Sequence, residues 1–347
     1  MSFISFIVYA YLLGAAGLIF LLARELRQER RLWTRLTHAP EKLWGRLIHR
    51  HQPFYLRHEI ILAKALIAIL VLGIFLAIDA RFIEPWLINI KPVDVSVAKL
   101  NRKIKIAWLT DLQVGNHKKD KWLEKVIEET IAAEPDIVIL GGDLLDNEGR
   151  YQDETPYLEP LKRLVGRQPI YYLMGNHEYG IGSAIRGRAE LYTGDVSAEL
   201  AEKMAVLGIP PLRNETACLE IKKQKICIFG ADDFWQKPID FSGLEKTDPT
   251  APLIFAAHNP DAILLWPTNR ELPDLTLAGH THGGQVWFPL LGPLGNGDIE
   301  LGKEYYRGLN YYHGAPIYTS IGLGESGGPL RLFSPPEMTI ITLKPKK

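Results

Sequence analysis

Six short apolar runs follow residue 100, and each ends in a cluster of polar residues. They are IKIAWLTD (104–111), PDIVILGGD (135–143), QPIYYLMGNHE (168–178), KICIFGADD (225–233), PLIFAAHNP (252–260) and PDLTLAGHTHGG (273–284). Continuous apolar runs of this kind are typical of strands buried on both faces. The segments between them, such as 119–134, alternate apolar and charged residues at helical spacing. The sequence therefore predicts a layered α/β domain, in which ligands bind beyond the strand ends.

The polar residues at these strand ends carry metal-binding and catalytic chemistry. In chain order they are Asp111, Asp143, Asn176, His177, His258, His280 and His282. A single strand that ends in aspartate is commonplace, but successive strands of this kind would bring several polar groups into one cleft. Such groups are costly to bury and persist where a cation or catalysis uses them. Mixed aspartate, asparagine and histidine ligands suit Mn, Fe, Zn or Mg.

The motifs GGDLLD, GNHE, AAH and GHTHGG, in this order and at these separations, resemble those of the calcineurin-like metallophosphoesterases. The resemblance covers residues 95–345, and the tail at 318–343 is similar to the membrane-associated bacterial branch of that family. That branch includes phosphodiesterases and hydrolases of lipid-linked nucleotide sugars. The resemblance implies a four-layer α/β/β/α sandwich over residues 91–347. It also implies hydrolysis of a phosphodiester or pyrophosphate bond by water that metal ions activate.

Carried over residue by residue, the resemblance implies a site for two divalent ions. Asp111 and His282 would bind the first ion, and Asp143 would bridge both. Asn176, His258 and His280 would be the other ligands of the second ion. His177 would be the general acid, and Asp146 would hydrogen-bond to it. Two cations about 3.5–4 Å apart need a shared negative ligand, and they lower the pKa of a bridging water.

Gln113 departs from the family pattern, in which the residue two positions after the first aspartate is usually histidine. Three interpretations stay open. Gln113 binds the first ion through its carbonyl oxygen, which favours Mn or Mg over Zn; or it orients a water on that ion; or the first site is defective. Because all other expected ligands are present, we favour an active enzyme with Mn as its metal, and with Mg, Fe or Zn as alternatives.

The first ninety residues contain two long apolar segments, at 2–23 and 60–80. About twenty apolar residues suffice to cross a bilayer as a helix, so we expect membrane helices at 3–23 and 60–80 and an anchor over residues 1–90. The loop between them, 24–59, holds eight arginines and one lysine against four glutamates. It is expected either to lie on the membrane as an amphipathic helix or to be a solvated connector.

The basic loop also predicts a topology. The positive-inside rule places it in the cytoplasm, which makes the protein a two-span protein of the inner (plasma) membrane with its catalytic domain outside the cytoplasm.

The two cysteines, Cys218 and Cys227, lie on either side of a Lys-rich turn. Depending on the register of the hairpin, the two sulfurs could face each other, and a disulfide is the alternative in an oxidising compartment; we favour two buried thiols.

The late segments are rich in aromatic and apolar residues, which either pack against the core or line a groove for an acyl chain, a prenyl chain or a nucleobase. We therefore expect a membrane-resident, lipid-linked phosphoester as substrate, although no substrate-binding residue is identified. Nucleic acid is not expected as a partner, because acidic side chains outnumber basic ones 34 to 29 after residue 90 and duplex binding needs a basic track. The alternative is a non-catalytic membrane scaffold with a defective first metal site. The oligomeric state is not predicted.

Overall fold

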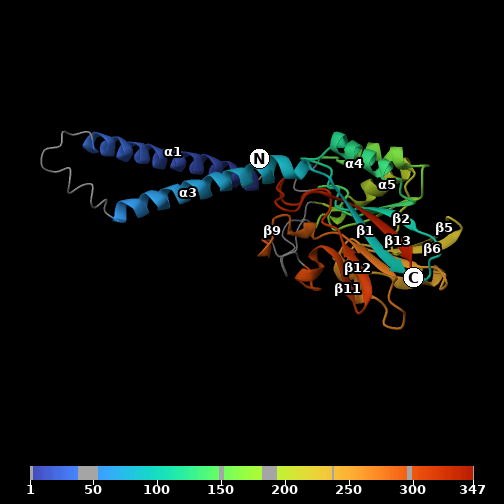
Figure 1. Ribbon diagram of the computed structural model, residues 1–347. Helices are drawn as coiled ribbons and strands as arrows, with labels where there is room; N and C mark the ends of the chain where they lie inside the picture. Colours follow the sequence, from blue (N-terminus) through green and yellow to red (C-terminus); the bar gives the residue numbers. More distant parts are fainter. Residues whose placement is uncertain are drawn as a thin grey trace. The chain divides into compact units, whose positions relative to one another are not determined.

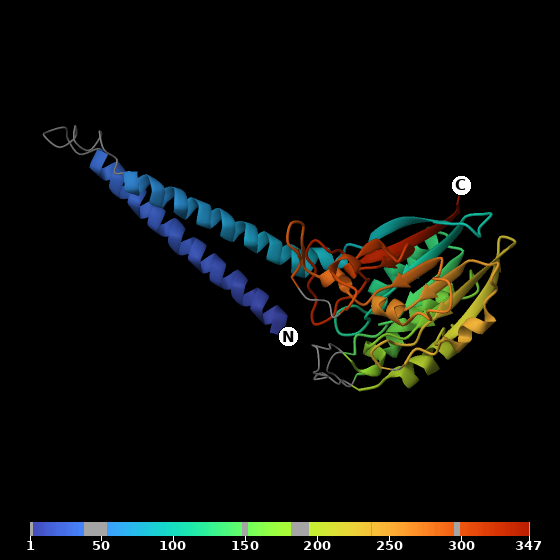
Figure 2. The ribbon, with the colours of Figure 1, turned by 90° about the horizontal axis from the view of Figure 1, so that it is seen from below.

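The computed structural model (Figure 1) describes residues 3–37, 54–147, 152–181, 194–236, 238–294 and 299–346. Near the N-terminus, helix α1 (Phe3–Thr37) contacts helix α3 (Phe54–Ile78), and both are seen from a second side in Figure 2. After α3 the chain continues through the helical turns η1 (Asp79–Ile83) and η2 (Glu84–Trp86). Both predicted helices are therefore present, and α1 runs beyond its expected end.

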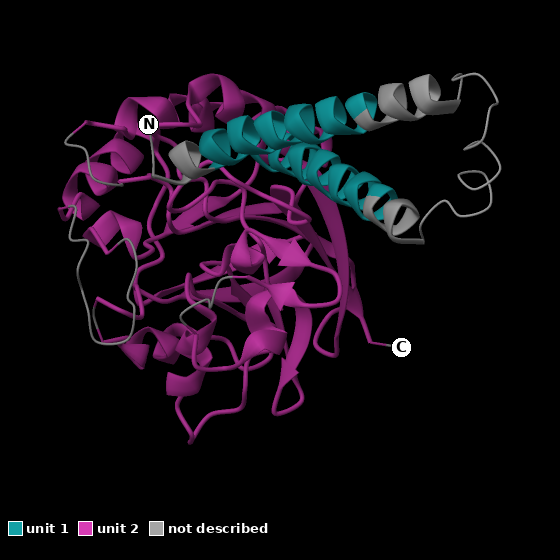
Figure 3. Ribbon diagram, turned by 90° about the vertical axis from the view of Figure 1, so that its left-hand side faces the viewer, with its two compact units in different colours: residues 1–83 teal, residues 84–347 magenta. Residues whose placement is uncertain are grey.

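Within these helices, Val8–Gln28 and Ile60–Trp86 are long and apolar enough to span a membrane. Of the predicted basic loop, residues 24–37 continue α1 as helix, and residues 38–53 lie outside the described residues. The chain divides into two compact units, residues 1–83 and 84–347 (Figure 3), whereas the sequence placed the division at residue 90.

Unit 2 contains two large mixed sheets and one small hairpin. The first sheet has the order β1 (Asn89–Val97), β13 (Glu337–Pro345), β2 (Ile104–Leu109), β3 (Ile137–Gly141) and β4 (Ile170–Leu173). The second has the order β11 (Gly308–Tyr312), β12 (Ala315–Thr319), β8 (Leu275–Ala278), β7 (Leu253–Ala256), β6 (Gln224–Gly230) and β5 (Glu215–Ile221). The hairpin pairs β9 (Trp287–Phe288) with β10 (Gly292–Pro293). All six strands predicted from the apolar runs are present.

The two large sheets face each other across a shared core. Alternate residues of β2 serve opposite faces: Ile106 and Trp108 pack in the core between the sheets, whereas Ala107 and Leu109 pack beneath the helical layer. Such alternation follows from the two-residue period of a strand. The outer face of the first sheet is covered by α4 (Asp120–Ala132), η3 (Thr155–Leu164) and α5 (Ser197–Leu207).

The outer face of the second sheet is covered by η5 (Phe241–Lys246) and η6 (Pro260–Leu265), through contacts around Phe229 and Phe255. Shorter turns are η4 (His177–Tyr179), η7 (His282–Gly284) and η8 (Lys303–Tyr306). The predicted four-layer α/β/β/α sandwich is confirmed.

Cys218 and Cys227 form a disulfide, so our preference for two thiols was wrong. The strands β5 and β6 pair as an antiparallel hairpin in which these two residues lie directly opposite each other. The turn between the strands contains Lys222 and Lys223, which both adopt positive φ. Turn geometry fixes the register of a hairpin, and this register could not be read from the Lys-rich turn alone.

Candidate metal centre

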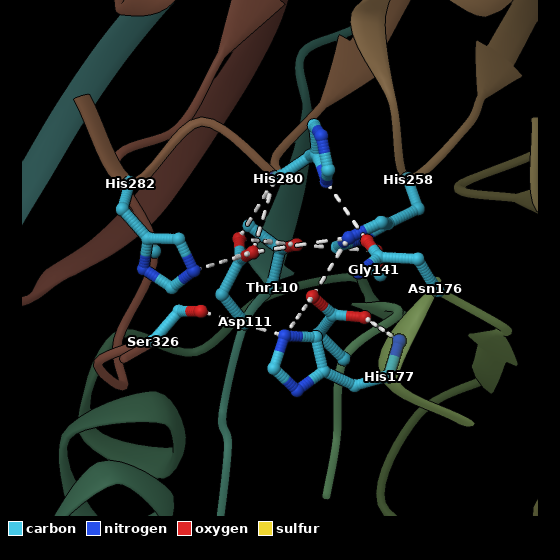
Figure 4. A network of polar contacts seen from close by, with 12 residues as sticks. Thr110, Asp111, Gly141, Asn176, His177, His258, His280, His282 and Ser326 are labelled. Carbon is cyan, nitrogen blue, oxygen red and sulfur yellow. Dashed lines mark hydrogen bonds and ion pairs between the residues drawn. The ribbon is translucent and has the colours of Figure 1, made fainter. Parts of the chain in front are cut away.

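The carboxyl ends of five parallel strands from the two sheets bring the predicted site residues together. Asp111 follows β2, Asp143 follows β3, and Asn176 and His177 follow β4. From the second sheet, His258 follows β7, and His280 and His282 follow β8. Figure 4 labels Asp111, Asn176, His177, His258, His280 and His282, whose side chains converge from both sheets.

The backbone is strained where these residues leave their strands. Asp111, Gln113, Asp143, His280 and His282 have φ angles of 53°, 41°, 48°, 69° and 49°. Non-glycine residues in this region cost of order 1–3 kcal/mol each and persist where the surrounding structure fixes them. Each sharp turn lets the chain leave its strand with a polar side chain directed into the site. Five of the predicted site residues are therefore among the thirteen non-glycine residues with positive φ in the described part of the chain.

Asp111, Asp143 and His282 form the first of two groups in which the candidate ligand atoms all lie within 4.8 Å of one another. His282 Nε2 lies 3.4 Å from Asp111 Oδ1. The Asp111 carboxylate accepts hydrogen bonds from Thr110 Oγ1 at 2.8 Å and from the main-chain N–H of His280 at 3.0 Å. These donors hold the carboxylate in place. Its Oδ1 still faces His282 Nε2, so a cation could be held between these two atoms.

Burial and nearby charge set the protonation of this first group. Burial raises the pKa of Asp111 to about 6, against the lowering effect of His258. Burial and the charge of Arg331, whose Nη2 lies 3.5 Å from His282 Nδ1, hold the pKa of His282 well below its usual value. The ring of His282 is therefore neutral, which is the form of histidine that binds metals.

The second group consists of Asp143, His258 and His280. His258 Nδ1 donates to the main-chain oxygen of Gly141 at 2.9 Å, which directs Nε2 into the site. That Nε2 lies 3.0 Å from Asp143 Oδ2, yet it has no aligned hydrogen-bond partner within the described part of the chain. A buried nitrogen that faces a carboxylate in this way matches a metal ligand whose ion lies between the two atoms.

Asn176 adds an oxygen to the second group. Its Nδ2 donates to the main-chain oxygen of Ile181, so that Oδ1 points toward His280, 2.9 Å from the Nδ1 of that ring. The ring of Trp235 lies edge-on against His280, with the ring centroids 4.4 Å apart. Burial and the charge of His258 lower the pKa of His280 to about 3, which keeps this imidazole neutral as well.

Asp143 belongs to both groups and lies between them. Burial raises its pKa, but the positive charges of His258 and His177 outweigh burial and hold the pKa well below its usual range. An ionised, buried carboxylate that belongs to both ligand groups is what a shared ligand for two cations requires. The donor set thus fits two divalent ions.

Gln113 is buried beside His177, with its Nε2 3.3 Å from His177 Nε2. Its Oε1 has no hydrogen-bond partner among the described residues. Leaving such an acceptor buried and unsatisfied costs about 1–3 kcal/mol, which a bound cation or its water would relieve. The amide is therefore compatible with the first two interpretations made from the sequence.

His177 is held in the site through its backbone and ring. Its main-chain N–H donates to Asp143 Oδ1 at 2.9 Å, and its Nε2 faces the site, 3.9 Å from Asp143 Oδ2. We expected Asp146 to hydrogen-bond to the ring. Its main-chain oxygen lies 2.5 Å from His177 Nδ1, and its carboxylate accepts from Asn116 at 3.1 Å. Sequence spacing cannot distinguish these two oxygens, because both belong to the same residue.

Glu178 has a supporting role that the sequence did not reveal. Its buried carboxylate accepts four main-chain hydrogen bonds, from Gly175, Asp143, Leu144 and Leu145, at 2.7–3.1 Å. These bonds join the turn after β3 to the turn after β4. Because Asp143 and His177 lie on those turns, Glu178 fixes the distance between them.

Replacing Glu178 by glutamine is expected to destabilise the fold by about 2–3 kcal/mol. One amide NH₂ would then face main-chain N–H groups and leave buried donors unpaired, which costs about 1–3 kcal/mol for each group. Chemical denaturation of the purified chain measures this loss. Glu159→Gln, which removes an exposed carboxylate bound to Lys203, is the matched control and should leave the transition midpoint unchanged. Equal midpoints for both variants would contradict the role given to Glu178.

Behind the first group lies a buried cluster of charges. Arg331 donates to the main-chain oxygens of Ile321, Gly322 and Ser334 at 2.8–3.1 Å. Its Nε lies 3.3 Å from Glu325 Oε1, which also accepts from Lys118 Nζ at 2.7 Å. Since both cations are buried and face Glu325, they organise the loop beside His282 rather than meet solvent.

The sequence of this chain is similar to those of known proteins over the region that contains the centre. Residues 104–284, which include every predicted ligand, match the calcineurin-like phosphoesterase family. An uncharacterized metallophosphoesterase of Helicobacter pylori (strain J99) is 32% identical over 266 residues, which are 74% of this chain and 64% of that protein. This chain thus spans less than two thirds of that relative.

Two further relatives carry informative names. Phosphodiesterase YaeI of Escherichia coli (strain K12) is 30% identical over 247 residues, which are 69% of this chain and 82% of that protein. A bovine transmembrane protein with metallophosphoesterase domain is 31% identical over 272 residues, covering 73% of this chain and 56% of that protein.

Proposed function

Because the chain belongs to the calcineurin-like phosphoesterase family, we propose that it is a membrane-anchored, two-metal phosphodiesterase. The observation that carries this proposal is the position of Asp143, which is shared by two groups of buried aspartate and histidine side chains. Two divalent ions held there would lower the pKa of a water and stabilise the charge that develops on phosphoryl oxygens. The similarity to phosphodiesterase YaeI supports a diester over a monoester substrate.

The site residues would have separate roles in metal binding and proton transfer. Asp111, His282 and Asp143 would hold the first ion, and Asp143, Asn176, His258 and His280 the second. His177 would give the proton on its Nε2 to the leaving oxygen, while the main-chain oxygen of Asp146 accepts from Nδ1 and keeps the ring oriented. General acids of this kind contribute about 10²–10⁴-fold to a rate.

Gln113 would supply its unpaired Oε1 to the first ion, directly or through a water. An amide oxygen is a harder ligand than imidazole, so the site would prefer Mn to Zn. The test is turnover of bis(p-nitrophenyl) phosphate by the full-length protein after removal of metal with a chelator. Activity should return with Mn, and Gln113→His should shift the preference toward Zn. Activity that persists without any metal would contradict the proposal.

The substrate proposed for this enzyme is a phosphodiester with an apolar part that resides in the membrane. Two helical stretches that are long and apolar enough to span a bilayer support an anchor. An enzyme held at a bilayer meets lipid-linked esters at high local concentration, and soluble esters only at their bulk concentration.

We place the catalytic unit outside the cytoplasm. The arginine-rich segment between the two candidate spans favours a cytoplasmic loop, and the Cys218–Cys227 disulfide favours an oxidising compartment for unit 2. A periplasmic-type alkaline phosphatase reporter fused after Lys347 is therefore expected to be active, whereas a reporter that needs the cytoplasm, such as β-galactosidase, is expected to be inactive. The reverse pattern would overturn this topology.

A further inference from the structure

Large apolar side chains are exposed on the hairpin after the site and on the loop beside it. Leu290, Leu291 and Leu294 are 98%, 78% and 66% exposed, and Phe333 is 41% exposed. We call these four residues the apolar rim. The hairpin of β9 and β10 and the loop near Phe333 are joined by a main-chain hydrogen bond from Trp287 N–H to Leu332 O at 2.8 Å, and the rings of Phe288 and Phe333 lie 6.0 Å apart. Large apolar side chains that are exposed on two joined segments are typical of a contact site.

The loop that carries Phe333 is bound to Glu84, the first residue of unit 2, which also lies in the last turn of the second apolar stretch. That apolar stretch, with a mean hydropathy of 2.9, ends at Trp86, and its residue Glu84 belongs to unit 2. The carboxylate of Glu84 is buried and accepts hydrogen bonds from the main-chain N–H groups of Phe333, at 2.8 Å, and of Ser334. The loop that carries part of the rim is thus bound to the last turn of the span.

The connection between the span and the first sheet is short. The span ends at Trp86 and β1 begins at Asn89, so at most about 10 Å of chain can separate them. The exposed side chains of Trp86 and Leu87 continue the apolar character beyond the helix. A surface bound to this short connection would lie within reach of a bilayer that the span crosses.

The rim is also connected to the candidate metal centre. Gln285, three residues after His282, accepts from Ser326 N–H through its side-chain oxygen at 2.6 Å and donates from Nε2 to Ser326 O at 2.9 Å. Its main-chain oxygen accepts from Leu332 N–H at 2.9 Å. The hydroxyl of Ser326 lies 3.5 Å from His177 Nε2. The segment that carries the rim thus borders the edge of the site where the leaving group would be protonated.

From these connections we propose that the apolar rim inserts into the bilayer from which the second span emerges, and that the substrate enters the site from that bilayer. The leucines would lie among lipid chains, and Arg307, whose guanidinium stacks 4.9 Å over the Trp287 ring, would lie at the level of the anionic headgroups. A phosphodiester with an apolar tail would reach His177 with its tail still in lipid. This inference deepens the proposed function and, in its part on substrate entry, rests on it.

Membrane insertion itself is tested without catalysis. The full-length Leu290→Cys variant would be labelled with bimane and reconstituted in phosphatidylcholine–phosphatidylglycerol nanodiscs. The bimane fluorescence should be quenched by lipids that carry a nitroxide on the acyl chain. The chain has two cysteines, and both are in the disulfide, so the introduced thiol is labelled selectively. The matched control is Val206→Cys on α5, which is 78% exposed and therefore also open to solvent. Equal quenching at both positions would overturn insertion of the rim.

Substrate entry is tested with two esters and one pair of substitutions. The double variant Leu290→Ser with Leu291→Ser is compared with the wild type on p-nitrophenyl hexadecyl phosphate in nanodiscs and on soluble bis(p-nitrophenyl) phosphate. The ratio of the two kcat/KM values is expected to fall by about tenfold or more, since each leucine loses its burial in lipid. Val206→Ser should leave the ratio unchanged. An unchanged ratio in the double variant would overturn entry from the bilayer, whereas no turnover of either ester by the wild type would refute the proposed function alone.

Discussion

Substitution of His177 by asparagine is expected to lower kcat for a dialkyl phosphate by about 10²–10⁴-fold, the usual contribution of a general acid. Asparagine keeps the backbone hydrogen bond to Asp143, but it has no ring nitrogen to protonate the leaving oxygen. Steady-state kinetics measures the loss, and metal analysis of the same sample should show an unchanged metal content.

The leaving group makes this prediction specific. A p-nitrophenolate leaves with little help from an acid, so the same variant should lose much less activity toward bis(p-nitrophenyl) phosphate than toward the dialkyl ester. A purely structural role for His177 would instead lower both rates by the same factor. Equal losses for the two esters would therefore contradict the assignment of His177 as the proton donor.

Substitution of Asp143 by asparagine is expected to remove most metal binding and to lower kcat by about a hundredfold or more, since even partners that only support a ligand are worth 10–100-fold. The variant loses the one negative charge that both groups share. It also leaves His258 Nε2 without its nearest carboxylate oxygen, 3.0 Å away. Metal content after dialysis against Mn, together with kcat, measures both effects.

Asp261→Asn is the matched control for this prediction. Asp261 is also a buried carboxylate and accepts main-chain hydrogen bonds from Glu300 and Leu301, at 2.6 and 3.0 Å. The same chemical change there lies outside both ligand groups, so metal content and kcat should be retained. If Asp143→Asn kept two metal ions per chain, Asp143 could not be the shared ligand.

The fold could be predicted from the sequence to a large extent, because apolar patterning is a local property. The six apolar runs became β2, β3, β4, β6, β7 and β8, and the segment 119–134 became α4. The site followed from the same reasoning, since residues that end parallel strands meet at one edge of a sheet. The structure brings Asp111, Asp143 and His282 together as the strand ends require.

Other features could not be predicted, because they depend on contacts between distant segments or on whether a residue uses its main-chain or its side-chain atoms in a contact. The disulfide depends on a register that a Lys-rich turn does not specify. Glu178 is visible in the GNHE motif, but its role is not. The four main-chain N–H groups that donate to its carboxylate belong to two separate turns. The contact of His177 with Asp146 uses the main-chain oxygen, which every residue possesses and no motif identifies.

The most direct test of the central claim, a pair of metal ions that share Asp143, is the number of Mn ions that the intact chain binds. The full-length protein in nanodiscs would be stripped with a chelator and titrated with Mn, with bound metal and turnover of bis(p-nitrophenyl) phosphate followed in the same sample. The account predicts that activity and binding both saturate at two Mn per chain. Full activity at one Mn per chain, or saturation without any activity, would contradict it.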